Sequence, residues 1–329
     1  MKRLVDRFGR VHEYLRISVT DRCNLRCRYC LPLQGVVLKD RKDVLSFDEI
    51  ETLARIFVDL GIRKIRITGG EPLVRKGVEE LCLRLAAMPE LETLALTTNG
   101  VFLEEKAALL KNAGVQNLNI SLDTLRPERF RQITYRNEFD AVLRGIEAAL
   151  GVGFPSIKIN TVVMKGFNDD ELLDFVELAK ALSLSVRFIE YMPFRGNGWS
   201  EVRFLPYHAM KEVIESQYTL IPVQRNGTIH GPAKEFYVKE SNAVIGFITT
   251  MSEHFCSTCN RLRLTAVGKL RSCLFAREEF DLKRLLRARA SRDVIEDMIR
   301  MAVILKWEKH PDAEELVRSG NCVMTTVGG

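Results

Sequence analysis

Apolar and polar residues alternate along six short segments in the first two-thirds of the chain, and this alternation predicts six β-strands. The segments span residues 15–20, 64–68, 93–98, 117–123, 156–163 and 184–191. Between them, apolar residues recur with helical spacing, which predicts helices over 46–60, 77–87, 104–113, 139–150 and 169–182. A regular alternation of strand and helix is typical of a parallel sheet with right-handed crossovers.

Residues at the ends of these segments support the predicted helices. Ser46 stands three residues before Glu49, which is the pattern of a capping box at a helix start. Gly61, Gly114 and Gly151 follow three predicted helices, at the position where glycine commonly ends a helix.

The polar positions of the strands share one face of the predicted sheet. Arg16, Arg66, Asn119 and Lys158 occupy strand centres on that face. Strands of a doubly wound sheet are almost continuously apolar, because helices cover both faces. A complete eight-stranded barrel fills its interior with branched apolar side chains. The pattern therefore favours an open, splayed barrel around a large polar ligand, rather than an exposed sheet face.

The regular alternation stops around Pro193, Gly196 and Gly198. Beyond it the pattern predicts a helix near 206–216, short strands near 237–248 and 261–267, and helices between 280 and 306. We place a domain boundary here, with one domain over 1–192 and a mixed α+β domain over 193–329.

Six of the eight cysteines fall into two groups. A C-x3-C-x2-C motif at 23–30 follows the first strand, and a C-x2-C-x13-C motif at 256–273 lies on either side of the strand at 261–267. The members are Cys23, Cys27 and Cys30 in the first cysteine group, and Cys256, Cys259 and Cys273 in the second. Structural zinc usually takes four ligands, whereas three thiolates suit an iron–sulfur cluster with one iron open to a substrate or cofactor. Two such clusters are a simpler account than one zinc site with two cysteines left over.

Composition sets limits without assigning a function. The chain has 329 residues, 28% of them charged, and a formal net charge of +6, which does not indicate nucleic-acid binding but permits a local basic cavity for an anionic small molecule. No run approaches the ~18 apolar residues of a membrane span, and the first residues lack a secretory signal. We therefore expect a soluble, cytoplasmic protein. Cys82 is expected in a buried helix, and the five histidines at the surface or in caps.

The first cysteine group and the sequence GGEP after the second strand together resemble the radical S-adenosylmethionine superfamily. Further segments narrow the resemblance to the GTP 3′,8-cyclase family of molybdenum cofactor biosynthesis. These are LRISVTDRCN at 15–24, KIRITGGEP at 64–72, TTNG at 97–100, KINTV at 158–162, CSTCNRLR at 256–263 and GG at 328–329. The resemblance covers nearly the whole chain. It implies an incomplete (β/α)6 TIM-like barrel closed by a C-terminal α+β domain that carries a second iron–sulfur cluster.

The resemblance also implies two [4Fe-4S] clusters, S-adenosylmethionine and a set of site residues. The first cysteine group would hold the cluster that cleaves S-adenosylmethionine, and the second group would hold a cluster that binds guanine. The implied cofactor-binding residues are Tyr29, Gly70, Ser121 and Met192. The implied substrate-binding residues are Arg16, Arg66, Thr97, Lys158, Arg261, Leu262 and Arg263. Gly328 and Gly329 would form a catalytic tail that reaches into the barrel.

In the implied reaction, a 5′-deoxyadenosyl radical removes the 3′ hydrogen of GTP, and the ribose carbon then bonds to C8 of guanine. The product is 3′,8-cyclo-7,8-dihydro-GTP, the first step of molybdenum cofactor biosynthesis. The implied partners are GTP, a one-electron reductant of flavodoxin or ferredoxin type, and the cyclic pyranopterin monophosphate synthase that takes the product. No nucleic-acid or membrane partner is expected, and a homodimer is left open.

Alternatives remain for the protein and for single residues. A radical peptide-modifying maturase with an auxiliary cluster is the second enzyme hypothesis, although such enzymes usually carry more C-terminal cysteines. A binding module stabilised by zinc or a cluster is a third. The cavity cations could instead be structural partners of Asp123 or Glu190, and Met192 could be a core residue.

Overall fold

The computed structural model describes residues 3–30, 38–224, 231–319, 322–324 and 327–328. Its strands are β1 (Tyr14–Ser18), β2 (Lys64–Thr68), β3 (Thr93–Thr98), β4 (Asn117–Ser121), β5 (Ser156–Val163), β6 (Ser185–Glu190), β7 (Leu220–Pro222), β8 (Ala233–Val238), β9 (Val244–Ile248), β10 (Arg261–Leu264), β11 (Lys269–Arg271) and β12 (Phe280–Asp281). They form one twelve-stranded sheet in the order β12-β11-β10-β1-β2-β3-β4-β5-β6-β9-β8-β7.

The first six strands confirm the predicted parallel sheet, since β1 to β6 are parallel and follow one another in chain order. Two strands from the last third of the chain extend the parallel part: β10 pairs with β1, and β9 pairs with β6. Antiparallel strands continue from each of them to the two edges of the sheet. One sheet therefore contains strands from both sides of residue 193.

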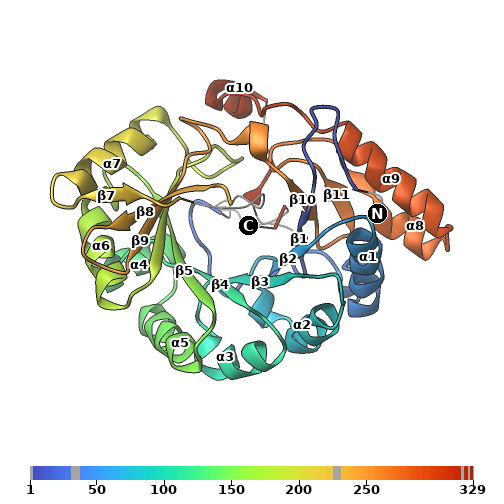
Figure 1. Ribbon diagram of the computed structural model, residues 1–329, viewed down its shortest axis with the longest axis horizontal. Helices are drawn as coiled ribbons and strands as arrows, with labels where there is room; N and C mark the ends of the chain where they lie inside the picture. Colours follow the sequence, from blue (N-terminus) through green and yellow to red (C-terminus); the bar gives the residue numbers. More distant parts are fainter. Residues whose placement is uncertain (1–2, 31–37, 225–230, 320–321, 325–326, 329) are drawn as a thin grey trace.

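The helices are α1 (Phe47–Asp59), α2 (Val78–Ala86), α3 (Leu103–Asn112), α4 (Pro127–Thr134), α5 (Phe139–Val152), α6 (Leu172–Ala181), α7 (Tyr207–Glu215), α8 (Leu282–Arg287), α9 (Arg292–Ile304) and α10 (Ala313–Arg318). Figure 1 shows α1, α2, α3 and α5 on the outer side of the curved sheet. Helix α4 was not predicted, because its short polar segment buries only Phe130, Ile133 and Thr134. No described helix is long and apolar enough to cross a membrane.

The predicted helix ends are confirmed at two of the three glycines. The capping box at α1 is present: Glu49 N–H donates to Ser46 Oγ at 3.1 Å, and Ser46 N–H donates to Glu49 Oε2 at 2.8 Å. Gly61 and Gly114 have φ angles of +101° and +84° just beyond α1 and α3. The third expectation was wrong, because Gly151 lies inside α5 and the left-handed residue that ends this helix is Gly153.

The apolar face of the strands packs against the helices, as the alternation predicted. Ile17, Ile67, Leu96 and Phe188 are completely buried in one core that also takes in Ile299 of α9. Cys82 is buried in the same core within α2, as predicted. The polar face of the same strands is left to line the interior of the curve.

Candidate functional site

A cavity of about 470 Å³ lies on the polar face of the sheet. Its lining includes both cysteine groups, although they are far apart in the sequence. Sixteen predicted site residues line it: Arg16, Cys23, Cys27, Tyr29, Cys30, Arg66, Gly70, Thr97, Ser121, Lys158, Met192, Cys256, Cys259, Arg261, Arg263 and Cys273. The fold thus brings most of the predicted site into one space.

The first cysteine group lies in the loop after β1, and this loop is attached to the end of α4. Arg26 N–H donates to Thr134 C=O, and Arg28 N–H donates to Ile133 C=O, each at 2.9 Å. Burial raises the pKa of the Cys30 thiol to about 12, and burial together with Glu71 raises that of Cys23 to about 11. Thiolates therefore form here when bound metal supplies positive charge.

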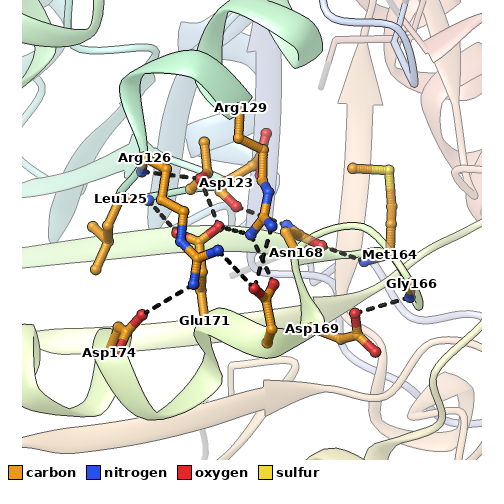
Figure 2. A network of polar contacts seen from close by, with 12 residues as sticks. Asp123, Leu125, Arg126, Arg129, Met164, Gly166, Asn168, Asp169, Glu171 and Asp174 are labelled. Carbon is orange, nitrogen blue, oxygen red and sulfur yellow. Dashed lines mark hydrogen bonds and ion pairs between the residues drawn. The ribbon is translucent and has the colours of Figure 1, made fainter.

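A buried polar network supports Tyr29, the aromatic residue beside Cys30. Tyr29 O–H donates to Asp123 Oδ2 at 2.7 Å, and Val162 N–H donates to Asp123 Oδ1 at 2.8 Å. Asn168 Nδ2 donates to the backbone C=O of Asp123 at 2.7 Å. Figure 2 shows Asn168 beside Asp123, at the point where strand ends and helices meet. Asp123 therefore fixes the Tyr29 hydroxyl from the end of β4.

Glu171 closes the other side of this network (Figure 2). Its completely buried carboxylate accepts hydrogen bonds from Thr124 Oγ1 and Leu125 N–H, each at 2.6 Å, and pairs with Arg129. Because Arg129 belongs to α4, the network joins the start of α6 to the helix whose end is hydrogen-bonded to the first cysteine loop. Neither Glu171 nor Asn168 was predicted, since nothing in the local pattern connects them to the cysteines.

The GGEP turn packs against the same cysteine loop. A Cβ on Gly70 would collide with Arg22 C=O, and Glu71 N–H donates to that carbonyl at 2.8 Å. The structure thus explains the glycine at position 70 by the close packing of two backbone segments. The sequence analysis had explained it by the approach of a cofactor. Gly70 still lines the cavity.

Glu71 of this turn is buried and holds the end of β3. Its carboxylate accepts from Thr98 Oγ1 at 2.8 Å and from Asn99 N–H at 2.7 Å. Burial raises its pKa to about 7 in spite of these donors. Asn99 in turn places its side-chain amide 3.8 Å from Cys23 Sγ. Glu71 and Asn99 are site residues that the sequence analysis did not assign.

The second cysteine group is arranged by a hairpin. Cys259 lies two residues before β10 and Cys273 two residues after β11, and because these strands are antiparallel the two cysteines lie at the same end of the hairpin. Burial raises the pKa of Cys273. At Cys259 burial acts in the same direction, but Arg261 and Lys306 outweigh it and lower the pKa to about 6.

All eight cysteines are free thiols, and the six cysteines of the two groups line the cavity. Within the described residues, no three Cys, His, Asp or Glu side chains are placed to hold one metal ion. A four-iron cluster spreads three thiolates over three different irons, so its cysteines stand further apart. Each group supplies three free cysteines to the cavity lining, which is the number of thiolates that a [4Fe-4S] cluster with one open iron takes.

Basic residues of neighbouring strands gather on the cavity wall. Arg16 of β1 lies between its register partners Arg263 of β10 and Arg66 of β2. Arg66 Nε donates to Tyr14 O–H at 2.6 Å, and Arg66 Nη1 donates to Thr97 Oγ1 at 3.2 Å. Burial and the charges of Arg66 and Arg261 lower the pKa of Arg16 to about 10. Cations that repel one another on a buried wall favour an anionic ligand.

The alternative interpretation, in which the cavity cations are structural partners of Asp123 or Glu190, is not supported by the contacts of these two carboxylates. Asp123 is engaged by Tyr29 and Val162, as described above. Glu190 accepts from the backbone N–H groups of Tyr207, Met251 and Ser252 at 2.7 to 3.0 Å. Among the described residues, neither carboxylate forms an ion pair with an arginine or lysine of the cavity.

Among the described residues, Leu262 and Gly328 are the predicted site residues that do not line the cavity. The side chain of Leu262 is completely buried in the core and does not line the cavity. Gly329 lies outside the described residues. Met192 lines the cavity and also packs against the cluster of Phe194 and Phe275, and its role as a cofactor contact stays a prediction.

The chain end lies at the arginine wall. Arg263 Nη1 donates to Gly328 C=O at 3.0 Å. A Cβ on Gly328 would lie 2.8 Å from Ser18 Cβ, so the tail touches the end of β1. Arg263 therefore contacts the tail as well as the cavity.

The cavity contains further residues that the sequence analysis missed, among them Tyr14, Lys64, Arg187 and His310. Tyr14 and Lys64 share the parity of Arg16 and Arg66, so the strand pattern could have found them. Arg66, Arg16 and Lys64 outweigh the burial of Tyr14 and lower its pKa to about 7.

The expectation for the histidines was wrong at two positions. His310 and His12 are both buried. Burial lowers the pKa of His12 to about 4, and its Nε2 lies 3.0 Å from Asp6 Oδ2. Isolated histidines carry no sequence signal that separates a buried from an exposed site.

Comparison with known proteins gives a consistent result. Residues 17–179 match the Radical SAM superfamily, and residues 184–311 match the family Molybdenum Cofactor Synthesis C. The chain is 50% identical to a GTP 3′,8-cyclase of Moorella thermoacetica, over 93% of this chain and 94% of that protein. It is 44% identical to the protein "GTP 3′,8-cyclase, mitochondrial" of Arabidopsis thaliana, over 99% of this chain and 83% of the relative.

Among solved structures, Streptococcus suis SuiB bound to S-adenosylmethionine is similar with a TM-score of 0.62 and 16% identity, over 88% of this chain and 68% of that one. At this identity the likeness concerns the fold alone.

Proposed function

This chain belongs to the GTP 3′,8-cyclase family of the radical S-adenosylmethionine superfamily, and we propose that it is the lyase that converts GTP to 3′,8-cyclo-7,8-dihydro-GTP, the first step of molybdenum cofactor biosynthesis. The observation that carries the proposal is the shared cavity: two cysteine groups and a basic wall line one space of about 470 Å³. The peptide-modifying alternative is not favoured, because the relatives of high identity are cyclases and the likeness to SuiB is one of fold.

The cysteines present fit two [4Fe-4S] clusters. Cys23, Cys27 and Cys30 would hold the one that the radical S-adenosylmethionine family implies. When bound, this cluster supplies the electron that splits S-adenosylmethionine into methionine and a 5′-deoxyadenosyl radical. The second cysteine group would hold another cluster, which would offer guanine a place to bind.

The chain's own residues at the first cysteine group would bind and orient S-adenosylmethionine. Tyr29, Gly70, Ser121 and Met192 line the cavity together with this group. Asp123 holds the Tyr29 hydroxyl at 2.7 Å, which restrains the ring beside the cluster. The packing of Gly70 on the backbone of Arg22 fixes the distance between the GGEP turn and the cysteine loop.

The basic wall would bind the triphosphate of GTP. Arginine suits this task because its planar donors bind two phosphate oxygens at once. Arg16, Arg66 and Arg261 would provide most of this binding, with Lys158 and Thr97 beside them. Bound in this way, GTP would be held at both ends, by guanine and by triphosphate, so that its ribose faces the first cysteine group. The side chain of Leu262 makes no part of this surface, whereas Gly328 and Gly329 would complete it as the catalytic tail.

The finer organisation belongs to the same proposal. We regard residues 1–192 as an incomplete (β/α)6 barrel and residues 193–329 as the domain that carries the second cluster and much of the substrate site. We further propose a cytoplasmic protein that receives electrons from a flavodoxin- or ferredoxin-type donor and passes its product to cyclic pyranopterin monophosphate synthase. A homodimer is the oligomer to test first.

Anaerobic reconstitution tests the proposed function. The chain is loaded with iron and sulfide and incubated with GTP, S-adenosylmethionine and dithionite, and the products are separated by mass-resolved chromatography. We expect about eight irons per chain and formation of both 5′-deoxyadenosine and the cyclised nucleotide, with neither product when dithionite is omitted. A zinc-loaded, colourless chain without S-adenosylmethionine cleavage would refute the proposal.

A further inference from the structure

Lys306 follows α9, and its side chain is only 2% exposed. Lysine is rarely buried to this extent without a partner. Its Nζ donates to Arg261 C=O at 2.8 Å and to Cys259 C=O at 3.2 Å, and it lies 3.7 Å from Cys259 Sγ. An ammonium has three N–H donors and a neutral amine has two. Three acceptors around Nζ therefore suit the charged form.

The charged and titratable groups around Lys306 include Cys259, Cys273, Arg10, Arg261 and His12. Within the described part of the chain, no carboxylate pairs with this ammonium. Burying an ammonium without a counter-charge costs several kcal/mol. The negative charge that balances Lys306 must therefore come from the side of the cysteines.

The charges around the first cysteine group are mainly negative. Glu71 acts on Cys23 more strongly than Arg26 does, and Asp123 acts on both Cys27 and Cys30. Among the described residues, the cation that acts on these thiols is an arginine and not a lysine. A buried lysine is thus a specific feature of the second group.

Arg10 fixes the segment that carries Lys306. Its guanidinium donates to Cys256 C=O at 2.7 Å, to Trp307 C=O at 2.7 Å and to Glu308 C=O at 2.8 Å. Asp6 holds Arg10 through its Nε at 2.6 Å. The N-terminal segment thereby ties the residues after Lys306 to the turn that contains Cys256. Lys306 is thus held by its own hydrogen bonds to Cys259 and Arg261 and by the bonds of Arg10 to the two residues that follow it.

We propose that Lys306 is a positioning residue of the second cluster, whose ammonium orients Cys259 and raises the reduction potential of that cluster by balancing the charge of its thiolates. Charges and hydrogen bonds at the sulfurs are known levers on iron–sulfur potentials. A fixed positive charge favours the reduced cluster, because reduction adds negative charge. The inference rests on the second cluster that the proposed function assigns to Cys256, Cys259 and Cys273.

The test uses the full chain loaded with both clusters, in a redox titration followed by electron paramagnetic resonance. A chain with Cys23→Ser, Cys27→Ser and Cys30→Ser identifies the signal of the second cluster. Lys306→Met removes the charge, and Lys306→Arg keeps it. Lys283→Met is the matched control, because Lys283 also donates to a backbone carbonyl, that of Asp43 at 2.6 Å, but does not touch the cysteines.

In Lys306→Met we expect the equilibrium constant for reduction of the second cluster to fall about tenfold, a shift of about 59 mV to more negative potential. The potential of the first cluster should not change. Lys306→Arg and Lys283→Met should keep the wild-type potential of the second cluster. If Lys306→Met fails to hold the second cluster, retention with a near-wild-type potential in Lys306→Arg supports the proposal.

Three results would overturn it. The first is a fully loaded Lys306→Met chain with the wild-type potential. The second is a Lys306→Arg chain that shifts as far as Lys306→Met or loses the second cluster with it, since charge would then not be the cause. The third is a triple-serine chain without iron, which would refute the cluster assignment itself and the inference with it.

Discussion

Gly328→Ala is the sharpest perturbation of the C-terminal tail, because the structure gives two separate penalties for a side chain there. Gly328 has a φ of +73°, a left-handed conformation that costs about 1–2 kcal/mol for an L-residue. The new Cβ would also lie 2.8 Å from Ser18 Cβ and 3.3 Å from Thr68 Cγ2. Both neighbours belong to strands and have little room to move, so crowding adds about 1–3 kcal/mol.

Together the two penalties weaken docking of the tail by at least about 2 kcal/mol, which lowers the ratio of docked to undocked tail about 30-fold. The hydrogen bond from Arg263 to Gly328 C=O, at 3.0 Å, already stabilises the docked wild-type tail, so it does not compensate for the penalties that the new side chain adds. We expect cluster content and cleavage of S-adenosylmethionine to survive, while the cyclised product per 5′-deoxyadenosine falls about tenfold or more.

Product ratios are measured by chromatography, and docking is measured by hydrogen exchange of the C-terminal peptide. Gly153→Ala is the matched control, because Gly153 has the same φ of +73° but nothing within 4 Å of a new Cβ. It should lose some stability and keep the wild-type product ratio. A Gly328→Ala enzyme with wild-type product ratio and wild-type exchange of the terminal peptide would refute the reasoning.

Three further predictions concern other parts of the chain. Cys27→Ala should abolish cleavage of S-adenosylmethionine, because one ligand of the electron source is lost; 5′-deoxyadenosine formation at the wild-type rate would exclude this cysteine group as the radical generator. Cys273→Ser should instead keep that cleavage, uncoupled from cyclisation, and weaken GTP binding in equilibrium dialysis; unchanged GTP affinity would contradict the role given to the second group. The contribution of His12 should lower the free energy of unfolding by about 3 kcal/mol as the pH drops from 6.5 to about 4. In this window His12 becomes protonated in the unfolded chain but not in the native chain, where its pKa is lowered to about 4. His12→Gln should remove this part of the pH dependence in denaturant titrations, and an identical profile would contradict it.

The strand pattern was sufficient to predict the sheet and its polar face. Parity placed Arg16, Arg66 and Lys158 on one surface, and the structure confirms that surface as a cavity wall. Leu262 has the opposite parity to Arg261 and Arg263; it entered only through the resemblance and proves to be buried in the core. Local alternation is therefore a better guide to side-chain direction than membership of a conspicuous motif.

What local patterns could not provide was long-range pairing. Nothing in the segment at 261–267 indicates that β10 pairs with β1, although this pairing sets Arg263 beside Arg16. Helix α4 was not predicted because its segment is polar, yet the C=O of its residue Thr134 accepts a hydrogen bond from the first cysteine loop. In the sequence, nothing distinguishes Lys306 from a surface lysine, and only the fold shows that it lies against Cys259. These residues act through tertiary contacts, and such contacts leave no periodic pattern in the sequence.

Transfer of a label from substrate to cofactor tests the central claim most directly. GTP that carries deuterium at the 3′ carbon is incubated anaerobically with the reconstituted enzyme, S-adenosylmethionine and dithionite, and the mass of the 5′-deoxyadenosine is measured. If the cavity holds the ribose of GTP against the site of the first cysteine group, the 5′-deoxyadenosine formed with each cyclised product gains one deuterium. Formation of the cyclised product together with unlabelled 5′-deoxyadenosine would contradict the account.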